Sequence, residues 1–295
     1  MENLLSLFDI SSDRTRFQST TVQNKKGYYD LVEKKFISSQ KILKLINELK
    51  PDDSFEITPN DSILIDKIKK RIAQNLSFMQ NNSRDSYSIK FLRYVSNRFL
   101  SSQSDPNLLS AILFVDIVKS TNLANILSPD AMSSLVRVFS QEISILISKH
   151  SGFVLKYAGD AVIAFFPISK DTNKMCQNVV SCAKSMNLLI KYVINPVFEK
   201  FGLPKIQIRV GIESGNSQIV FFGQEPDLIG STITMTSKIY PLAEPCQIAI
   251  GEEVYKKLNG AASHFSQIQS DSEFSHINPN TNKKYEVYLS KEIFS

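Results

Sequence analysis

LSAILFVDIVKST (residues 109–121) and FVLKYAGDAVIAFF (residues 153–166) are the two stretches that decide the fold of this chain. The first is nearly all apolar up to Asp116, a pattern typical of a buried strand. In the second, Phe153–Tyr157 and Ala161–Phe166 are strand-like runs separated only by Ala-Gly-Asp, which predicts a hairpin with a tight turn. We therefore expect three strands of one sheet, with one carboxylate where the first strand ends and another at the tip of the hairpin.

Outside these stretches, helical and strand patterns alternate. An amphipathic segment from about Pro129 to Lys149 lies between them, and a further helix is predicted over Thr172–Lys200. The remaining predicted elements are short; they are Ile206–Ile212 and Gln218–Phe222 as strands, Ser231–Leu242 as a helix, Gln247–Ile250 as a strand, Glu252–Leu258 as a helix, and a hairpin of His264–Gln269 with Tyr285–Leu289. This order predicts an α+β fold, a ferredoxin-like βαββαβ sandwich with its helices on one face of a mainly antiparallel sheet.

The first third of the chain has a different pattern. Apolar residues recur at three- and four-residue steps from Leu31 to Leu49 and from Ile63 to Leu76, and a third candidate helix runs from Tyr87 to Leu100. A Ser/Asp/Pro-rich linker follows at 101–107. We predict an N-terminal helical region over residues 1–105 and a second domain over residues 106–295.

Composition excludes several classes of protein. Apolar residues make up 42% of the 295 residues and charged residues 21%, as in soluble globular proteins. The three cysteines and three histidines show no metal-ligand spacing, and a reducing compartment is the simpler interpretation for the thiols. No apolar run approaches the ~20 residues that a bilayer needs, and the N-terminus lacks the basic start of a signal peptide. We therefore expect a cytoplasmic protein without a membrane segment.

The net charge of +5 is mild, and residues 1–105 hold much of it, with 17 basic and 13 acidic side chains. Dispersed charge of this size is typical of a solvated surface, so nucleic acid is not the expected partner, although RNA binding by the first hundred residues stays an alternative. The pairs Phe165-Phe166 and Phe221-Phe222 lie at the ends of predicted strands, and we interpret both as core rather than as base-stacking platforms.

Asp116 and Asp160 are the residues with the clearest chemical potential. If their strands are neighbours, both carboxylates reach the same edge of the sheet, and such hard oxygen ligands suit Mg²⁺ or Mn²⁺. The backbone N–H groups of Ser120 and Thr121, at the start of a helix, would suit anionic oxygens. Taken alone, these residues favour simpler structural roles, with Asp116 capping a helix and Asp160 shaping a turn.

Four motifs in order shift this balance: FVDIVKST (114–121), KYAGD (156–160), IRVGIESG (208–215) and DLIGSTITMTSK (227–238). Together they resemble the class III adenylate/guanylate cyclase catalytic domain. The resemblance covers about residues 108–250 and implies a nucleotidyl cyclase, an enzyme that converts a nucleoside triphosphate into a 3′,5′-cyclic mononucleotide and pyrophosphate. It also implies a homodimer whose two active sites form across the interface.

The resemblance implies a role for each matching residue. Asp116, Ile117 and Asp160 would hold two divalent metal ions, Mn²⁺ or Mg²⁺, and Arg209 would contact the β- and γ-phosphates. Lys156 and Asp227 occupy the positions that read the adenine edge in adenylate cyclases of this family. Lys can donate to a ring nitrogen and Asp can accept from an exocyclic amine, so this pair also admits cytosine and fits guanine worse.

Two positions depart from the family's pattern. Thr234 stands where the family commonly has an Asn that orients the ribose, and Lys238 stands where it has an Arg that stabilises charge at the α-phosphate. Lys keeps the charge but loses the bidentate fork of Arg. Losing one well-placed donor to the transition state typically lowers the rate by ~10²–10³-fold. We expect either a slower or a differently tuned enzyme.

These departures favour the bacterial pyrimidine cyclases of anti-phage signalling, which make cyclic CMP or cyclic UMP for a separate effector. Lys156 and Asp227 favour ATP instead, so an adenylate cyclase stays an alternative. The second alternative is a cyclase-like module that binds nucleotide without turnover, and Thr234 and Lys238 favour it. Asp116, Asp160 and Arg209 together favour the enzyme.

Overall fold

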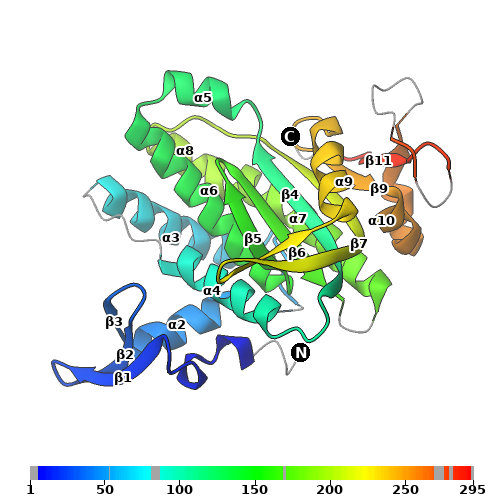
Figure 1. The fold of residues 1–295 in the computed structure, drawn as a ribbon. Helices are drawn as coiled ribbons and strands as arrows, with labels where there is room; N and C mark the ends of the chain where they lie inside the picture. The colour runs from blue at the N-terminus through cyan, green and yellow to red at the C-terminus, as the bar shows by residue number, and fades with distance from the viewer. Residues whose placement is uncertain are drawn as a thin grey trace.

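A large, mostly antiparallel sheet forms the centre of the computed structural model, which describes residues 6–52, 54–80, 87–168, 171–268, 276–278 and 282–293 (Figure 1). Its strands follow the order β10-β11-β9-β7-β4-β6-β5, and β8 pairs with β7 off this path. The four central strands are β4 (Asn107–Ile117), β5 (Phe153–Ala158), β6 (Ala161–Pro167) and β7 (Ile208–Phe222). Their order β7-β4-β6-β5 and antiparallel pairing are those of a ferredoxin-like βαββαβ unit, so the predicted α+β class is confirmed.

Four further strands extend this unit: β8 (Glu225–Ile229), β9 (Ile248–Gly251), β10 (Phe265–Gln267) and β11 (Val287–Ser290). β9 pairs parallel to β7, and β11 and β10 continue the sheet antiparallel. The predictions of β9 and of the C-terminal hairpin are therefore correct, whereas no sequence pattern predicted β8. The two strands predicted at Ile206–Ile212 and Gln218–Phe222 are one strand, because Gly215 and its neighbours stay extended and pair with β4.

One face of the sheet is covered by helices, as predicted. They are α6 (Pro129–Lys149) and α7 (Thr172–Leu189), with a π-helical turn at Ile190–Ile194 leading into α8 (Asn195–Lys200). Ser128 and Asp171 cap the N-termini of α6 and α7 by accepting backbone N–H hydrogen bonds. The apolar faces of these helices pack on inward-facing residues of β4, β6 and β7, such as Leu113, Ala164 and Val210. This core is continuous and holds the central strands rigidly.

The N-terminal third contains the three predicted helices: α2 (Ser39–Leu49), α3 (Ser62–Gln80) and α4 (Tyr87–Ser101). It also contains a three-stranded sheet that the sequence analysis did not expect: β1 (Phe17–Val22), β2 (Lys25–Asp30) and β3 (Lys35–Ser38). The prediction of helix between Leu31 and Ser38 is therefore wrong. Gln23 and Asn24 both have positive φ, as a two-residue hairpin turn requires, and this turn pairs β1 with β2.

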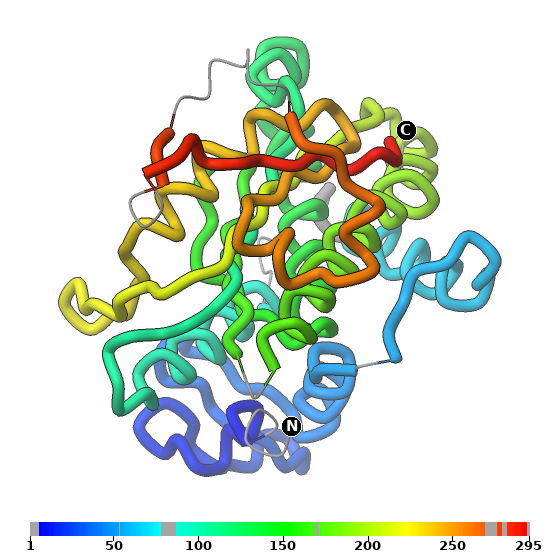
Figure 2. The backbone as a smooth tube through the Cα atoms, turned by 90° about the vertical axis from the view of Figure 1, so that its right-hand side faces the viewer, coloured from blue at the N-terminus to red at the C-terminus, as the bar shows by residue number. Residues whose placement is uncertain are grey.

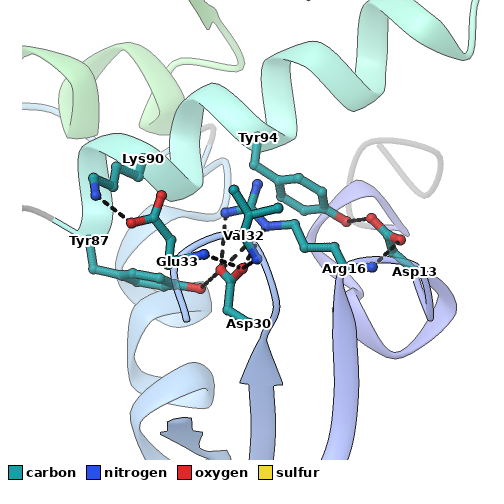
Figure 3. Close-up of polar contacts among 8 residues, drawn as sticks. All are labelled: Asp13, Arg16, Asp30, Val32, Glu33, Tyr87, Lys90 and Tyr94. Atoms are coloured by element: carbon teal, nitrogen blue, oxygen red, sulfur yellow. Dashed lines mark hydrogen bonds and ion pairs between the residues drawn. The ribbon is translucent and has the colours of Figure 1, made fainter. Parts of the chain in front are cut away.

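A buried aspartate links this small sheet to α4, because it pairs with Arg16 beside the sheet and also accepts a hydrogen bond from Tyr87 of α4 (Figure 3). Asp30 is fully buried; it accepts hydrogen bonds from the Nε and Nη2 atoms of Arg16, from the Tyr87 hydroxyl and from the backbone N–H groups of Val32 and Glu33. Burial raises the pKa of Asp30, but these hydrogen bonds outweigh it, and the net pKa is lowered. The carboxylate is therefore kept charged by its own chain.

The second face of the large sheet is covered by α4, which corrects the expectation of helices on one face only. Phe91, Leu92 and Val95 of α4 share a core with Phe153 and Phe165 of the sheet. Elsewhere, Arg71 of α3 forms ion pairs with Glu142 of α6 and Glu48 of α2. The N-terminal region thus forms part of the same packed body as the sheet, at the end opposite the C-terminal strand (Figure 2).

Among the described residues, no helix is both long and apolar enough to cross a bilayer.

Candidate active site

Asp116 and Arg209 lie side by side at one end of the sheet because they are register partners in β4 and β7. The Arg209 guanidinium donates to both carboxylate oxygens, from Nε to Oδ1 at 3.0 Å and from Nη2 to Oδ2 at 3.1 Å. The hydrogen bond to Asp116 raises the pKa of Arg209, and partial burial opposes that shift. A charge-assisted bidentate pair of this kind fixes both planes, so Arg209 is positioned directly over the end of β4.

Asp160 reaches the same edge of the sheet from the tip of the β5–β6 hairpin. Its Oδ2 accepts a hydrogen bond from the backbone N–H of Ile117 at 3.3 Å. Gly159 occupies the left-handed region (φ 65°) in the two-residue turn, which leaves the Asp160 side chain free to turn toward β4. The expectation that the Asp116 and Asp160 side chains reach the same edge of the sheet is therefore confirmed.

Tyr240 completes this group, and the sequence analysis missed it. Its ring stacks on Phe114 of β4 at 5.8 Å between centroids, and the Arg209 guanidinium lies 5.2 Å from the ring centroid. Burial raises the pKa of Tyr240, and the negative charges of Asp116 and Asp160 add to this. Gly211 makes the approach possible, because a Cβ there would lie 2.4 Å from the Tyr240 Cβ. In the sequence, Gly211 is the one sign that another residue packs closely at this position.

The donor set at this end of the sheet fits a divalent cation that arrives with a phosphate ligand. Mg²⁺ usually keeps waters and binds through one or two carboxylates plus substrate phosphates. Asp116 and Asp160 supply two carboxylates beside the main chain of Ile117. Within the described parts of the chain, no cluster of three or more His, Cys, Asp or Glu side chains could hold a metal ion. The arrangement therefore suits a shared metal–nucleotide site better than a closed structural one.

Ser120 and Thr121 open the short helix α5 (Ser120–Ile126), as expected from the sequence. Lys119 precedes them with left-handed backbone angles (φ 56°, ψ 33°) and gives the first turn no side-chain cap. A non-glycine residue in this region is under strain of about 1 kcal/mol or more, and such strain gathers at functional sites. The sharp turn directs the start of α5 across the end of β4.

Lys156 of β5 and Asp227 form an ion pair, in which Lys156 Nζ lies 2.6 Å from Asp227 Oδ2. Asp227 lies in β8, and its Oδ1 accepts a hydrogen bond from the backbone N–H of Leu228 at 2.8 Å. The β7–β8 hairpin crosses the sheet in front of β5 and β6, which brings Asp227 to Lys156 (Figure 1). The two residues expected to read the base are thus neighbours within one chain.

Thr234 and Lys238 lie one turn apart on the exposed face of α9 (Ser231–Ile239). The Thr234 hydroxyl donates to the Gly230 carbonyl at 3.3 Å, and Lys238 Nζ lies 3.5 Å from His276 Nδ1. Among the described residues, no hydrogen bond or ion pair joins Lys238 to Asp116 or Asp160. One chain therefore holds two separate groups of candidate residues.

Two further predictions have different outcomes. Phe165 and Phe166 are buried in the core, as expected. Phe221 and Phe222 are 56% and 68% exposed, so the interpretation of this pair as core is wrong. The reason is that β4 ends its pairing with β7 at Gln218, so beyond this residue β7 has only β8 as a neighbour.

Comparison with known proteins places this fold among cyclases. The sequence profile described as "Adenylate and Guanylate cyclase catalytic domain" matches residues 103–289, which is more than half of the chain. A cytidylate cyclase from Escherichia coli is 23% identical over 283 residues, covering 91% of this chain and 62% of that protein. An adenylate cyclase from Anabaena cylindrica is 26% identical over 193 residues, covering 57% of this chain and 37% of its own length.

A uridylate cyclase from Treponema porcinum is 26% identical over 157 residues, covering 50% of this chain and 54% of that protein. The chain thus spans less than two thirds of the length of these curated relatives. Among solved structures, the adenylyl cyclase CyaB from P. aeruginosa superposes with a TM-score of 0.54 at 22% identity, covering 63% of this chain and 95% of that one. The guanylyl cyclase Cya2 gives 0.53 at 16% identity, covering 65% and 95%. At these identities the two structures establish the fold.

Proposed function

The chain belongs to the adenylate and guanylate cyclase catalytic domain family, and from this premise we propose that it converts a nucleoside triphosphate into a 3′,5′-cyclic mononucleotide and pyrophosphate. The observation that carries the proposal is the convergence of Asp116, Asp160 and Arg209 at one end of the sheet. These are the residue types that a triphosphate needs, namely two carboxylates for cations and one fixed guanidinium for phosphate oxygens.

In the proposed reaction, the ribose 3′-oxygen attacks the α-phosphorus, the bond from that phosphorus to the β-phosphate oxygen breaks, and the 3′ proton passes to water. Asp116, Asp160 and the main chain at Ile117 would hold two divalent ions, Mn²⁺ or Mg²⁺, whose charge neutralises the triphosphate and lowers the pKa of the 3′-hydroxyl. Arg209 would exchange its contact with Asp116 for the β- and γ-phosphates, and the start of α5 at Ser120 and Thr121 would face anionic oxygens. Positioning and charge neutralisation are the main tasks.

We propose further that the active site is shared between two copies of the chain. Thr234 and Lys238 are exposed and make no contact with Asp116 in the described structure, so a partner's Asp116 group could meet them across an interface. In that arrangement Thr234 would contact the ribose and Lys238 the α-phosphate. The test mixes Asp116→Ala and Lys238→Ala chains, each inactive alone. Partial recovery of activity is expected, and inactive but well-formed heterodimers would argue against a shared site.

The Lys156–Asp227 pair supports cytosine or adenine as the base. A ring nitrogen acceptor beside an exocyclic amine matches Lys as donor and Asp as acceptor, and both cytosine and adenine present this edge. Uracil and guanine present a ring N–H beside a carbonyl and fit the pair worse. We propose CTP as the preferred substrate, because the alignment with the E. coli cytidylate cyclase extends over 91% of the chain and so includes much of the N-terminal region. ATP is the alternative.

Incubation of the purified chain with each of the four nucleoside triphosphates and Mn²⁺ or Mg²⁺, followed by mass resolution of the products, tests the proposal. One cyclic nucleotide should dominate, together with pyrophosphate. Cyclic AMP as the main product would replace the cytidylate proposal by the adenylate one. No cyclic product with either metal, together with saturable nucleotide binding, would favour a non-catalytic cyclase-like module.

On the family resemblance alone, we extend the proposal to bacterial antiviral defence, in which the cyclic nucleotide would act on a separate effector protein. A cell that expresses the chain should then raise the level of its cyclic nucleotide after phage infection. An Asp116→Asn variant serves as the matched control, because it keeps the shape of the side chain. An unchanged nucleotide level during infection would argue against this role.

A further inference from the structure

Arg93 of helix α4 lies outside the family's matched segment and contacts β5, the strand that carries Lys156. Helix α4 ends at Ser101, just before the match begins at residue 103. It packs against β5 and β8, the two strands that carry Lys156 and Asp227. Figure 1 shows α4 running beside β5 where the β7–β8 hairpin crosses it. Helix α4 of the N-terminal region therefore packs against both strands of the proposed base-reading pair.

The direction of Lys156 depends on a β-bulge in β5. Val154 pairs with Ala164 and Lys156 pairs with Ile163, so Leu155 is an extra residue between them. Alternation would place Leu155 and Lys156 on opposite faces, but the bulge puts both on the face that α4 covers. Leu155 accordingly lies in the core beneath α4, and Lys156 reaches Asp227. Without the bulge, the Lys156 side chain would point to the opposite face.

Arg93 of α4 holds this bulge. Its Nη1 donates to the carbonyl of Val154, the last regular residue before the bulge, at 3.3 Å. Burial lowers the pKa of the Arg93 guanidinium, while the charges of Glu225 and Asp227 on β8 act in the opposite direction, together with Tyr157. Arg93 therefore binds one strand directly and lies within electrostatic reach of the acceptor on the other.

We propose that Arg93 is a positioning residue for nucleobase selection, which fixes the spacing between Lys156 and Asp227 for a base with a ring acceptor beside an exocyclic amine. This inference rests on the proposed function. Arg93 touches neither the base nor the phosphates; it acts through the bulge and through Asp227. Its loss should therefore weaken discrimination between bases and leave the chemical step unchanged.

The experiment compares Arg93→Met with Arg98→Met, because Arg98 lies on the same helix but donates to the carbonyls of Leu7 and Asp9 instead of β5. We expect Arg93→Met to raise KM for the preferred triphosphate and to lower its kcat/KM advantage over the next best by about tenfold, with kcat within about twofold. Arg98→Met should leave this ratio unchanged, and Arg93→Lys should restore most of it. An equal loss in both Met variants, or none in Arg93→Met, would overturn the inference.

A second arm tests whether Arg93 acts through the pair. In a background with both Lys156→Ala and Asp227→Ala, Arg93→Met should cause no further loss of selectivity, and an additional loss would refute the positioning role. Calorimetric binding of the four triphosphates to the same proteins separates this inference from the proposed function. A chain that binds one base selectively but makes no cyclic product refutes the enzyme and still reports on Arg93. If Arg93→Met does not fold, Arg93→Gln, which keeps a donor without the charge, replaces it.

Discussion

Two aspartate–arginine pairs in this molecule have the same bidentate geometry and opposite surroundings. Asp30 and Arg16 lie at one end of the small sheet, where the Tyr87 hydroxyl of α4 also donates to Asp30, and the Asp30 side chain is fully buried (Figure 3). Asp116 and Arg209 lie at the end of the large sheet, with side chains 12% and 29% exposed. The Asp30 carboxylate accepts from Arg16, Tyr87 and two backbone amides, whereas Arg209 is the one donor to the Asp116 side chain in the described structure.

This difference distinguishes a structural carboxylate from one that is available to a ligand. Each carboxylate oxygen offers two lone pairs, and at Asp30 the protein's own donors use nearly all of them. At Asp116 each oxygen bonds one Arg209 nitrogen and keeps acceptor capacity toward solvent. Loss of the Asp30 carboxylate would leave Arg16, Tyr87 and two backbone amides without their acceptor, whereas loss of the Asp116 carboxylate would leave only Arg209, whose side chain is 29% exposed. The Asp116 carboxylate therefore keeps acceptor capacity for a ligand, which the Asp30 carboxylate lacks.

The largest expected effect is on activity, and it comes from a change at Asp116, the carboxylate with remaining acceptor capacity. Asp116→Asn should lower cyclase activity on the order of 10³-fold or more, because the carboxylate charge that would hold the cations is lost. The free energy of unfolding should fall less than in an Asp30 variant, because the Asn keeps the shape of the side chain and its amide oxygen can still accept a hydrogen bond from Arg209. Activity and urea denaturation of the same preparation provide the two measurements. A stability loss as large as that of an Asp30 variant would contradict the distinction.

A change at Asp30, the structural carboxylate, should instead lower stability and leave activity nearly unchanged. Asp30→Ala should lower the free energy of unfolding by about 3–5 kcal/mol, because Arg16 and two backbone amides lose their acceptor inside the protein. Below the unfolding transition, kcat should stay within about threefold of the wild type if the variant stays folded. Because the folded pKa of Asp30 is lowered, its stabilisation is present above the unfolded pKa of about 4 and is lost as the pH falls through the folded value. Urea midpoints between pH 3 and pH 7 measure this loss.

A third carboxylate sharpens the comparison because, among the described residues, it is buried without a cationic partner in direct contact. Glu213 in β7 accepts from the Tyr285 hydroxyl and from the Ser214 backbone N–H, and burial raises its pKa to about 8. A folded pKa above the unfolded value means that the folded state binds the extra proton between about pH 4.5 and pH 8. Stability should therefore fall as the pH rises through this window, by at most about 1.4 kcal/mol per unit. Glu213→Gln should flatten the slope, and an unchanged slope would exclude Glu213 as its source.

The smallest expected effect concerns the ring beneath Arg209. Tyr240→Ala should lower kcat/KM by about two- to fivefold, because a cation–π contact at a partly exposed site contributes about 0.5–1 kcal/mol. Tyr240→Phe keeps the ring and should stay near the wild type. Steady-state kinetics of the two variants measure the difference. Equal losses in both would show that the hydroxyl matters and not the ring.

Much of the catalytic domain could be predicted from local patterns. The run from Leu109 to Asp116 and the hairpin with Asp160 at its tip are short-range features, and the structure places their carboxylates together as expected. The N-terminal sheet was missed because β1 and β2 carry few apolar residues, so their alternation is weak. Phe221 and Phe222 have the composition of a core strand, and only the end of β4 pairing at Gln218 leaves them exposed.

The sequence by itself determined the βαββαβ order, the family and the identity of the candidate residues, because periodicity and motif spacing depend on neighbours along the chain. Only the tertiary structure decided that α4 covers the second face of the sheet, that a bulge turns Lys156 toward Asp227, that Tyr240 packs against Arg209, and that Arg93 contacts the bulge. These features arise from contacts between segments far apart in the sequence. The same is true of the two aspartates, because the number of donors around Asp30 or Asp116 depends on which distant elements pack against it.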